Sequence, residues 1–418
     1  MHRLRADPPG DPCRLEPTTR GDGRRDDHPE RTGRGVHTMR ITEVVAAVAA
    51  QVVGDPLVVC SLGSGRRAWE SVDPGWLTFS ASDPMGAGPG LALGLALQRP
   101  DDEVVLIEGD GDLAMSLGSL LTLADVAPAN LRVVVVRNGR YDTGGGTPLA
   151  GGRGPGFAAL AAEAGWCWTH TVVDADEVDA AVAAWAQAPG PAMLEAVVEP
   201  VGGGYPPAPR WSPAEERAFY DRRRDERDAA AGRPLLGTPA TSHPDAGAMS
   251  VADALVDVGV TTVASLPDSW LRPLLDEVDA DPRLRHVRVT REDEAIAVAA
   301  GVALGGGFGA VLCQNAGLLL STNVLAAYVH LHRFPLVVVA VDRGDVDDDQ
   351  YYQLYKHQVT AGVLSAVGLE VHRMAAPPLA PAVAAVAVQA RLARRPGIVL
   401  ASRAALVNRG GTTTDRLA

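Results

Sequence analysis

The sequence predicts an α/β protein made of two doubly wound parallel-sheet domains joined by a linker. Short apolar, β-branched segments alternate with segments of helical periodicity, first over residues 41–198 and again over 251–401. The stretch between them is rich in Pro, Gly and charged residues, which is typical of a linker. With 418 residues and 46% apolar content, the chain is long enough for two or three domains with ordinary cores.

Composition divides the chain into five stretches. Residues 1–38 hold many Arg, Asp, Pro and Gly but few large apolar side chains, so we expect a disordered tail and take Met39 as a candidate start. The other expected stretches are a first domain over 39–200, a linker with one charged, solvated helix over 201–248, a second domain over 249–407 and a tail over 408–418.

Net charge and cysteine usage exclude several classes of function. The formal net charge of −13 argues against nucleic acid as a partner and gives no support for binding to an anionic membrane surface. No apolar run reaches the length of a membrane span, and the first residues lack the apolar core of a signal peptide. Cys13, Cys60, Cys167 and Cys313 have no metal-ligand spacing, so we expect reduced thiols and a cytoplasmic location.

In the first domain each expected strand is a short β-branched run, and each expected helix has apolar residues three and four positions apart. The small residues Ser61–Gly65 follow the first strand and form a loop that could approach a ligand. In order, the elements are a helix from Ile41, strand Leu57–Cys60, helix Leu91–Leu97, strand Val104–Ile107, a helix through Leu113–Leu123, strand Leu131–Val136, and helix–strand units over Phe157–Thr171 and Glu177–Val198.

The same alternation returns in the second domain, which predicts a doubly wound sheet of similar size. The expected helices are Val251–Val258, Trp270–Val278, Glu292–Leu304, Thr322–His330, Val363–Val367 and Leu379–Arg394. The expected strands are Thr261–Leu266, His286–Val289, Ala310–Cys313, Leu336–Val341, Val371–Arg373 and Ile398–Ala401.

The segment Gly109–Asn138 points to a cofactor. Gly109-Asp110-Gly111 lies at the carboxyl end of one predicted strand, and Asn138 follows the next. The two glycines let the backbone approach a phosphate, and the helix after them offers free N–H groups to an anion. Asp110 and Asn138 add hard oxygen ligands at the ends of adjacent strands. The pattern predicts a Mg²⁺–diphosphate site, with an ordinary turn and a strand-end Asn as the alternative.

The spacing of Gly-Asp-Gly, 26 residues and Asn resembles the motif of thiamine-diphosphate-dependent decarboxylases and carboligases. This resemblance implies the thiamine-diphosphate-binding fold, with a diphosphate-binding domain first and a pyrimidine-binding domain second. It also implies that Asp110 and Asn138 bind Mg²⁺ through their side chains and Arg140 through its backbone carbonyl. Further residues that it places at the cofactor are Gly109, Gly111, Asp112 and Tyr141.

A second motif of the family stands before the helix at Leu91. In Thr78–Gly90, Met85 and Gly86 match a bulky residue and glycine, and the bulky side chain wedges beneath the cofactor in the family. Asp83 and Pro84 replace the usual Gly-Ser, and the carbonyl at the Asp83 position is expected to accept from the cofactor's amino group. A core methionine without a cofactor role is the alternative.

The Gly-rich segment 139–148 is expected to lack a packed element and to close over the diphosphate. It resembles the Asn-Gly…Gly-Gly-Gln-Pro-Thr segment of sulfopyruvate and phosphonopyruvate decarboxylases, with Gly146 in place of the Gln. This substitution removes one contact that the family makes with cofactor or substrate.

The second domain supplies an acidic residue. Acidic residues at the start of the helix from Glu292 are favoured by the helix dipole, which is the simpler interpretation. In the family, however, a Glu nine residues before a Gly faces N1′ of the pyrimidine, and counting back from Gly301 gives Glu292. Asp293 and Glu294 are expected to point elsewhere.

The resemblance continues at the expected reacting centre. Leu266–Leu274 is similar to the Val-Pro-Asp-Ser segment of phosphonopyruvate decarboxylases, and Gln314–Leu318 is similar to their Gln-Asn-Ser-Gly-Leu. It implies hydrogen-bonding roles for Asp268, Ser269 and Gln314. Candidates for binding a phosphonate or sulfonate are Arg291, Lys356 and His357, with ordinary surface residues as the alternative.

Together these motifs imply thiamine-diphosphate- and Mg²⁺-dependent decarboxylation of a 2-oxo acid with an anionic 3-substituent, as in phosphonopyruvate or sulfopyruvate. The products would be an aldehyde and CO2. A carboligase and a non-catalytic relative are the alternatives, the latter favoured by the changes at Asp83, Gly146 and Leu319. Because family sites join two chains, a homodimer or dimer of dimers is expected.

Overall fold

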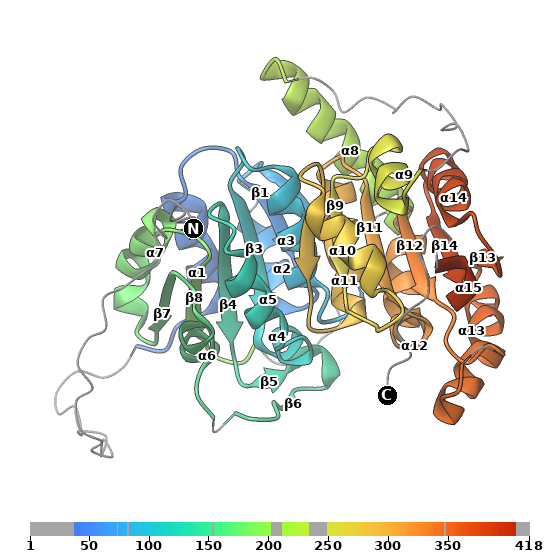
Figure 1. Ribbon diagram of the computed structural model, residues 1–418. Helices are drawn as coiled ribbons and strands as arrows, with labels where there is room; N and C mark the ends of the chain where they lie inside the picture. The colour runs from blue at the N-terminus through green and yellow to red at the C-terminus, as the bar shows by residue number, and fades with distance from the viewer. Residues whose placement is uncertain are drawn as a thin grey trace, which may run out of the picture.

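The computed structural model describes residues 37–406 apart from positions 73, 82, 153, 202–210, 234–248 and 347. Residues 1–36 of the expected first tail, the expected tail at 408–418 and much of the expected linker lie outside the described residues. Figure 1 shows two α/β halves side by side, the first coloured blue to green and the second yellow to red. The predicted fold class is confirmed.

The first half is a parallel sheet covered by helices on both faces. Its strands β1 (Leu57–Cys60), β2 (Leu77–Ser80), β3 (Val104–Gly109), β4 (Leu131–Arg137), β7 (Trp168–Val172) and β8 (Ala192–Val197) lie in the order β2-β1-β3-β4-β8-β7. The helices are α1 (Ile41–Gln51), α2 (Ser64–Val72), α3 (Gly88–Gln98), α4 (Asp110–Met115), α5 (Ser119–Val126), α6 (Phe157–Ala164) and α7 (Val178–Gln187). Because both faces of the sheet are covered, the inner strands are mostly apolar and buried, and Glu108 in β3 and Glu195 in β8 are buried charged residues among them.

The second half repeats this plan. Its strands β9 (Thr262–Ser265), β10 (Arg285–Arg288), β11 (Gly309–Gln314), β12 (Leu336–Val341), β13 (Val371–Met374) and β14 (Pro396–Ala401) lie in the order β10-β9-β11-β12-β14-β13. The helices are α9 (Val251–Asp257), α10 (Arg272–Ala280), α11 (Glu292–Leu304), α12 (Asn315–Leu320), a π-helix η3 (Val324–His330), α13 (Leu354–Ala366), α14 (Leu379–Ala393) and α15 (Arg403–Leu406). The two sheets therefore share one strand order.

That strand order places one crevice in each half. The order reverses between β1 and β3 and again between β9 and β11, and doubly wound sheets bind ligands at the carboxyl ends of the strands at such a point. In Figure 1, α4 and the hairpin β5 (Arg140–Tyr141) and β6 (Thr147–Pro148) lie below the first sheet and α12 lies below the second. Both crevices therefore open on the same side of the molecule.

Several local expectations are corrected. The helix expected through Leu113–Leu123 is two helices, α4 and α5, and Leu117 and Leu121 are exposed by 43% and 58%. The spacing of the leucines therefore predicted more buried side chains than the two helices have. The Gly-rich segment forms a short hairpin, β5–β6, whose two strands are largely exposed and enclose the turn at Asp142–Gly144.

The helix expected at Val363–Val367 is only the end of α13, which begins at Leu354. Apolar periodicity did not indicate the first turn of this helix, because large apolar and aromatic side chains, Leu354 and Tyr355 among them, are exposed there.

The cysteine expectation also needs correction: Cys167 is disulfide-bonded, whereas Cys60 and Cys313 are free and buried. Sequence spacing could not show which thiols approach in the fold.

In the part of the chain that the structure describes, no helix is both long and apolar enough to cross a membrane.

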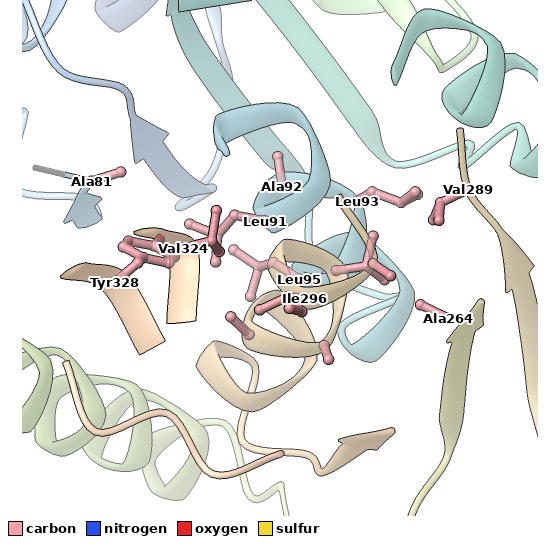
Figure 2. Close-up of a cluster of buried hydrophobic side chains, with 14 of the residues drawn as sticks. Ala81, Leu91, Ala92, Leu93, Leu95, Ala264, Val289, Ile296, Val324 and Tyr328 are labelled. Carbon is pink, nitrogen blue, oxygen red and sulfur yellow. The ribbon is translucent and has the colours of Figure 1, made fainter. Parts of the chain in front are cut away.

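The two halves meet where α3 crosses α11. A Cβ atom at Gly94 would overlap the carbonyl oxygen of Val298, and one at Gly301 would overlap the carbonyl oxygen of Leu91, so the two backbones are in direct contact. Figure 2 shows Leu91 and Leu95 of α3 beside Ile296 of α11, all fully buried. Because α11 is surrounded, every residue of it from Glu294 onward is buried.

The charged helix α8 (Pro213–Ala230) is not solvated as expected. It begins with a capping box of Ser212 and Glu215, and its buried residues follow a single helical stripe. The buried residues are Arg217, Tyr220, Asp221, Arg224 and Asp228. Apolar periodicity could not reveal this face, because charged side chains form most of it and their partners are distant in sequence.

The partners of α8 belong to both halves. Arg99 of the first half donates to Asp228 at 2.9 Å. Arg217 and Arg224 donate at 2.7 and 2.9 Å to the carbonyl oxygens of Ala303 and Leu304, which end α11. These guanidinium groups satisfy carbonyls that a helix leaves without intrahelical partners. The helix therefore ties the two halves together.

Gly94→Ala should destabilise the protein, because its methyl group requires α3 and α11 to separate. We expect the free energy of unfolding to fall by about 1–3 kcal/mol in urea denaturation. The matched control is Gly362→Ala in α13, where an added Cβ would meet no atom within 4 Å. The control should be neutral or slightly stabilising. Equal losses in both variants would contradict the proposed backbone contact.

Candidate cofactor site

A hollow at the first strand-order reversal collects most of the residues predicted to bind the cofactor. The loop after β1, the start of α4 and the hairpin β5–β6 form its walls. The predicted residues that line it are Met85, Gly109, Asp110, Gly111, Asp112, Asn138, Arg140 and Tyr141. Asp83 is the predicted first-half residue that does not line it. Predicted residues from Met85 to Tyr141, which lie 56 positions apart in the sequence, thus meet at one place.

Asp110 links the ends of adjacent strands. It starts α4 directly after β3, and its carboxylate accepts the N–H of Gly111 at 2.8 Å and the N–H of Gly139 at 2.7 Å. Asn138 is also held on both sides, because its side-chain oxygen accepts from the N–H of Arg140 and its amide donates to Asp142, each at 2.8 Å. The oxygens of Asp110 and Asn138 therefore have fixed positions at the hollow.

The hollow is negatively charged. Burial raises the pKa of Asp110 and of Asp112. Glu108, behind them, is fully buried, and burial raises its pKa as well. Asp142 lines the hollow too, and its Oδ1 is buried with no hydrogen-bond partner in the described residues. Buried carboxylates would repel a diphosphate unless a cation lay between them. Hard oxygen donors around an orphaned carboxylate oxygen fit Mg²⁺.

Gly111 is required by its neighbour. A Cβ atom on Gly111 would lie 2.8 Å from the ring of Tyr141, so the ring covers the glycine directly. The sequence pattern predicts that this glycine lets the backbone approach a phosphate. The Tyr141 ring is a second reason why a larger residue would not fit there.

Met85 lies at the boundary between the two halves. It lines the hollow around Asp110 and also a smaller one that Thr290 and Glu294 of the second half share. The turn that presents Met85 is held because Gly86, with φ of +88°, donates its N–H to Asp112. Asp83 lies close enough to Asp112 to help raise the pKa of that carboxyl, and burial raises its own pKa.

The second crevice gathers Asp268, Ser269 and Gln314. Gln314 donates to Asp268 at 2.9 Å, and Arg343 donates to Asp268 at 3.2 Å and to the Ser269 hydroxyl at 3.3 Å. Arg343 also donates to Asp348 at 2.7 Å, and its guanidinium lies 4.2 Å from the centre of the Trp270 ring. Arg343 and Gly344 match an Arg-Gly pair that follows a strand in the related decarboxylases, but the pattern alone gave Arg343 no role, because it does not show which carboxylates the arginine meets.

Glu292 belongs to this second crevice. Its side chain packs against Gly317 of α12, where a Cβ atom would overlap it. Glu294, expected to point elsewhere, lines the hollow beside Met85 and accepts the N–H and hydroxyl of Thr290 at 3.0 Å each. Burial raises the pKa of Glu294. Asp110 thus lines the first hollow whereas Glu292 contacts α12 of the second half, and Glu294 is a site-lining residue that the sequence did not indicate.

Two models of one protein family match the chain. The C-terminal TPP binding domain of thiamine pyrophosphate enzymes matches residues 58–196, and the N-terminal TPP binding domain matches residues 245–361. Thiamine pyrophosphate is another name for thiamine diphosphate. The matches confirm the predicted resemblance and the reversed order of the two halves.

Known relatives agree with these matches. A phosphonopyruvate decarboxylase of Streptomyces viridochromogenes is 41% identical over 127 residues, which are 30% of this chain and 32% of that relative. The alpha subunit of a sulfopyruvate decarboxylase of Methanothermobacter thermautotrophicus is 37% identical over 115 residues, 28% of this chain and 70% of the subunit. The chain thus spans only about a third of the phosphonopyruvate decarboxylase.

The fold agrees with solved structures. A transketolase from Leishmania mexicana superposes with a TM-score of 0.58 over 88% of this chain and 78% of that one, at 14% sequence identity. At this identity the likeness concerns the fold alone. The two family models and the sulfopyruvate decarboxylase subunit show that the chain belongs to the thiamine pyrophosphate enzyme family, with the C-terminal type of domain ahead of the N-terminal type.

Proposed function

We propose that the protein decarboxylates a 2-oxo acid with an anionic 3-substituent, of the phosphonopyruvate or sulfopyruvate type, using thiamine diphosphate and Mg²⁺. The main support is the pair of crevices at equivalent places in the two sheets, one with Asp110 and Asn138 and the other with Glu292. The names of the relatives support the reaction and the substrate class. The products are an aldehyde and CO2.

The first crevice holds the metal and the diphosphate. Asp110 and Asn138 bind Mg²⁺ through side-chain oxygens, and Arg140 binds it through its backbone carbonyl. Support comes from the buried carboxylates, because burial raises the pKa of Asp110 and of Asp112 and a bound cation would offset the cost of keeping them charged. The backbone of Gly109 and Gly111 would hold the diphosphate, with Asp112 and Tyr141 beside it, since all four residues line the hollow.

Met85 and Glu292 orient the cofactor. Met85 supports the two rings from below, as its place between the two hollows suggests, and the carbonyl of Asp83 accepts from the amino group. The carboxyl of Glu292 faces the pyrimidine nitrogen. When bound, thiamine diphosphate supplies the carbanion that adds to the 2-oxo carbon and accepts the electron pair left by CO2.

Asp268, Ser269 and Gln314 act on the substrate. Their mutual hydrogen bonds and the stacked Arg343 and Trp270 hold them in one orientation. Asp268 and Gln314 position the carbonyl oxygen and the proton that the product carbon takes up. Fixed polar groups at a partly buried edge provide the preorganisation that catalysis needs.

A second copy of the chain completes each site. Asp110 and Glu292 lie at separate crevices of one chain, and large apolar side chains are exposed beside both, such as Met115 by 49% and Tyr355 by 67%. We place the diphosphate-binding domain at 39–200 and the pyrimidine-binding domain at 249–407. We also propose a cytoplasmic location.

Asp110→Asn should weaken cofactor binding, because it removes a charged Mg²⁺ ligand. In titration calorimetry with thiamine diphosphate and Mg²⁺, we expect at least a tenfold rise in Kd. Asp179→Asn, at an exposed position on α7, is the matched control and should bind as the wild type does. Unchanged affinity in the Asp110 variant would remove the metal-ligand assignment.

Glu292→Gln should abolish most CO2 release while leaving cofactor binding in place. With phosphonopyruvate, sulfopyruvate and pyruvate as substrates, we expect kcat to fall by about a hundredfold or more. Glu163→Gln on the exposed face of α6 serves as control. Cofactor binding without CO2 from any of the three acids in the wild type would favour a carboligase or a relative without this chemistry.

Mixing the two inactive variants tests the second copy. If each site takes Asp110 from one chain and Glu292 from the other, a mixed dimer regains one intact site. An equimolar mixture of Asp110→Asn and Glu292→Gln, after subunit exchange, should recover about a quarter of wild-type activity. Each variant alone, taken through the same exchange treatment, is the control. Mixed dimers without any recovery would mean that sites form within one chain.

A further inference from the structure

The charges at the second crevice are almost fully balanced. Arg343 is paired with Asp268 and Asp348, at 3.2 and 2.7 Å. His357 lies 3.1 Å from Asp342, which Arg373 also approaches at 3.5 Å. Each of these basic side chains therefore already has a carboxylate of the protein as its partner.

Arg291, the third candidate for binding the substrate's anionic group, is compensated as well. It forms an ion pair with Asp293 at 2.9 Å and lies at the hollow beside Met85, away from Asp268 and Gln314. An incoming anion would have to compete with that neighbouring carboxylate. Of the candidates from the sequence, only Lys356 remains.

Lys356 is held by neutral groups. Its ammonium donates to the side-chain oxygens of Gln353 at 2.7 Å and Gln314 at 3.3 Å, and no carboxylate of the described residues forms an ion pair with it. The ring of Tyr352 lies 5.9 Å away. A lysine ammonium has three N–H donors, so two amide oxygens leave one donor and the whole positive charge for a ligand.

Helix stability does not explain this lysine. Lys356 lies in the first turn of α13, where the helix dipole is positive and disfavours a cation. It is also the single lysine among 418 residues, because every other long basic side chain in the sequence is an arginine. A compact ammonium fits between two glutamine oxygens and a third acceptor, whereas a planar guanidinium presents its donors differently.

Gln314 connects Lys356 to the expected reacting centre. Its side-chain oxygen accepts from Lys356, and its amide donates to Asp268. Gln314 also precedes α12, and Gly317 in the first turn of that helix packs against Glu292. Lys356, Asp268 and Glu292 therefore surround the start of one short helix.

We propose that Lys356 binds the anionic group on C3 of the 2-oxo acid, a phosphonate or sulfonate, through its free N–H donor. The inference rests on the proposed function and names its specificity-determining residue. Gln314 and Gln353 are positioning residues that hold the ammonium without neutralising it. A substrate without an anionic group, such as pyruvate, leaves the ammonium unpaired and gains nothing from it.

Kinetics of Lys356→Gln test the proposal. For the anionic substrate, KM should rise roughly tenfold to a hundredfold, because one charge-assisted hydrogen bond is lost. The kcat/KM for pyruvate should change little, so the preference for the anionic acid falls by a similar factor. Lys356→Arg keeps the positive charge and should recover part of the preference for the anionic acid. The matched control is Arg395→Gln, which changes an exposed cation just before β14. Arg395 lies at the amino end of that strand, whereas the crevice lies at the carboxyl ends of the strands.

A second measurement does not depend on turnover. Because Lys356 is the single lysine, an amine reagent such as trinitrobenzenesulfonate modifies only it and the N-terminal amine, and peptide mass spectrometry separates the two. In the holoprotein, 3-phosphonopropanoate and 3-sulfopropanoate should slow modification of Lys356. Propanoate, which lacks the second anionic group, should not slow it.

The outcomes separate the two proposals. Decarboxylation of an anionic acid with an unchanged preference in Lys356→Gln, and no protection of Lys356, would overturn the lysine assignment and leave the function standing. Protection without turnover of any acid would support the anion site and overturn the decarboxylase. If the circular-dichroism spectrum shows that Lys356→Gln is unfolded, Lys356→Arg and the protection experiment decide whether Lys356 binds the anionic group.

Discussion

The backbone contact between α3 and α11 fixes the geometry on which both crevices depend. α3 begins just after Met85 and Gly86, and α11 begins with Glu292. Because Gly94 and Gly301 bring the two helix backbones together without side chains between them, neither helix can slide without a steric clash. The place of Met85 beside the first turn of α11 therefore follows from two glycines in the middle of the helices.

The reversed order of the two domains needs a connection that does not disturb this contact. The helix α8 provides it on the side away from the crevices, where it reaches Arg99 just after α3 and the last carbonyls of α11. In Figure 1 it lies above the two sheets, opposite α4 and α12. Buried ion pairs add little net stability by themselves, but they specify one docking geometry, and here they connect the ends of the same two helices.

The two crevices differ in charge. The first has more carboxylates than nearby cations, so it favours a metal ion and an anionic cofactor together. In the second, carboxylates compensate the arginines while Lys356 is held by two amide oxygens. Thiamine diphosphate with Mg²⁺ and an anionic 2-oxo acid would satisfy both. The changes at Asp83 and Gly146 leave this balance intact, since neither removes a charged group from the hollow's lining.

The sequence by itself determined the elements and the motifs. The strands of the two six-stranded sheets other than β2, and the helices α3 and α11, follow from local apolar patterns. Gly109–Gly111 and Asn138 stand at strand ends that parallel topology brings together in the first sheet, as it brings Asp268 and Gln314 together in the second. Only the tertiary structure decided how charges pair across long separations. It buried one face of α8, bonded Cys167, turned Glu294 toward Met85 and left Lys356 among the neutral oxygens. Periodicity reports local burial of apolar side chains, whereas ion pairing depends on groups that only the folded chain brings within reach.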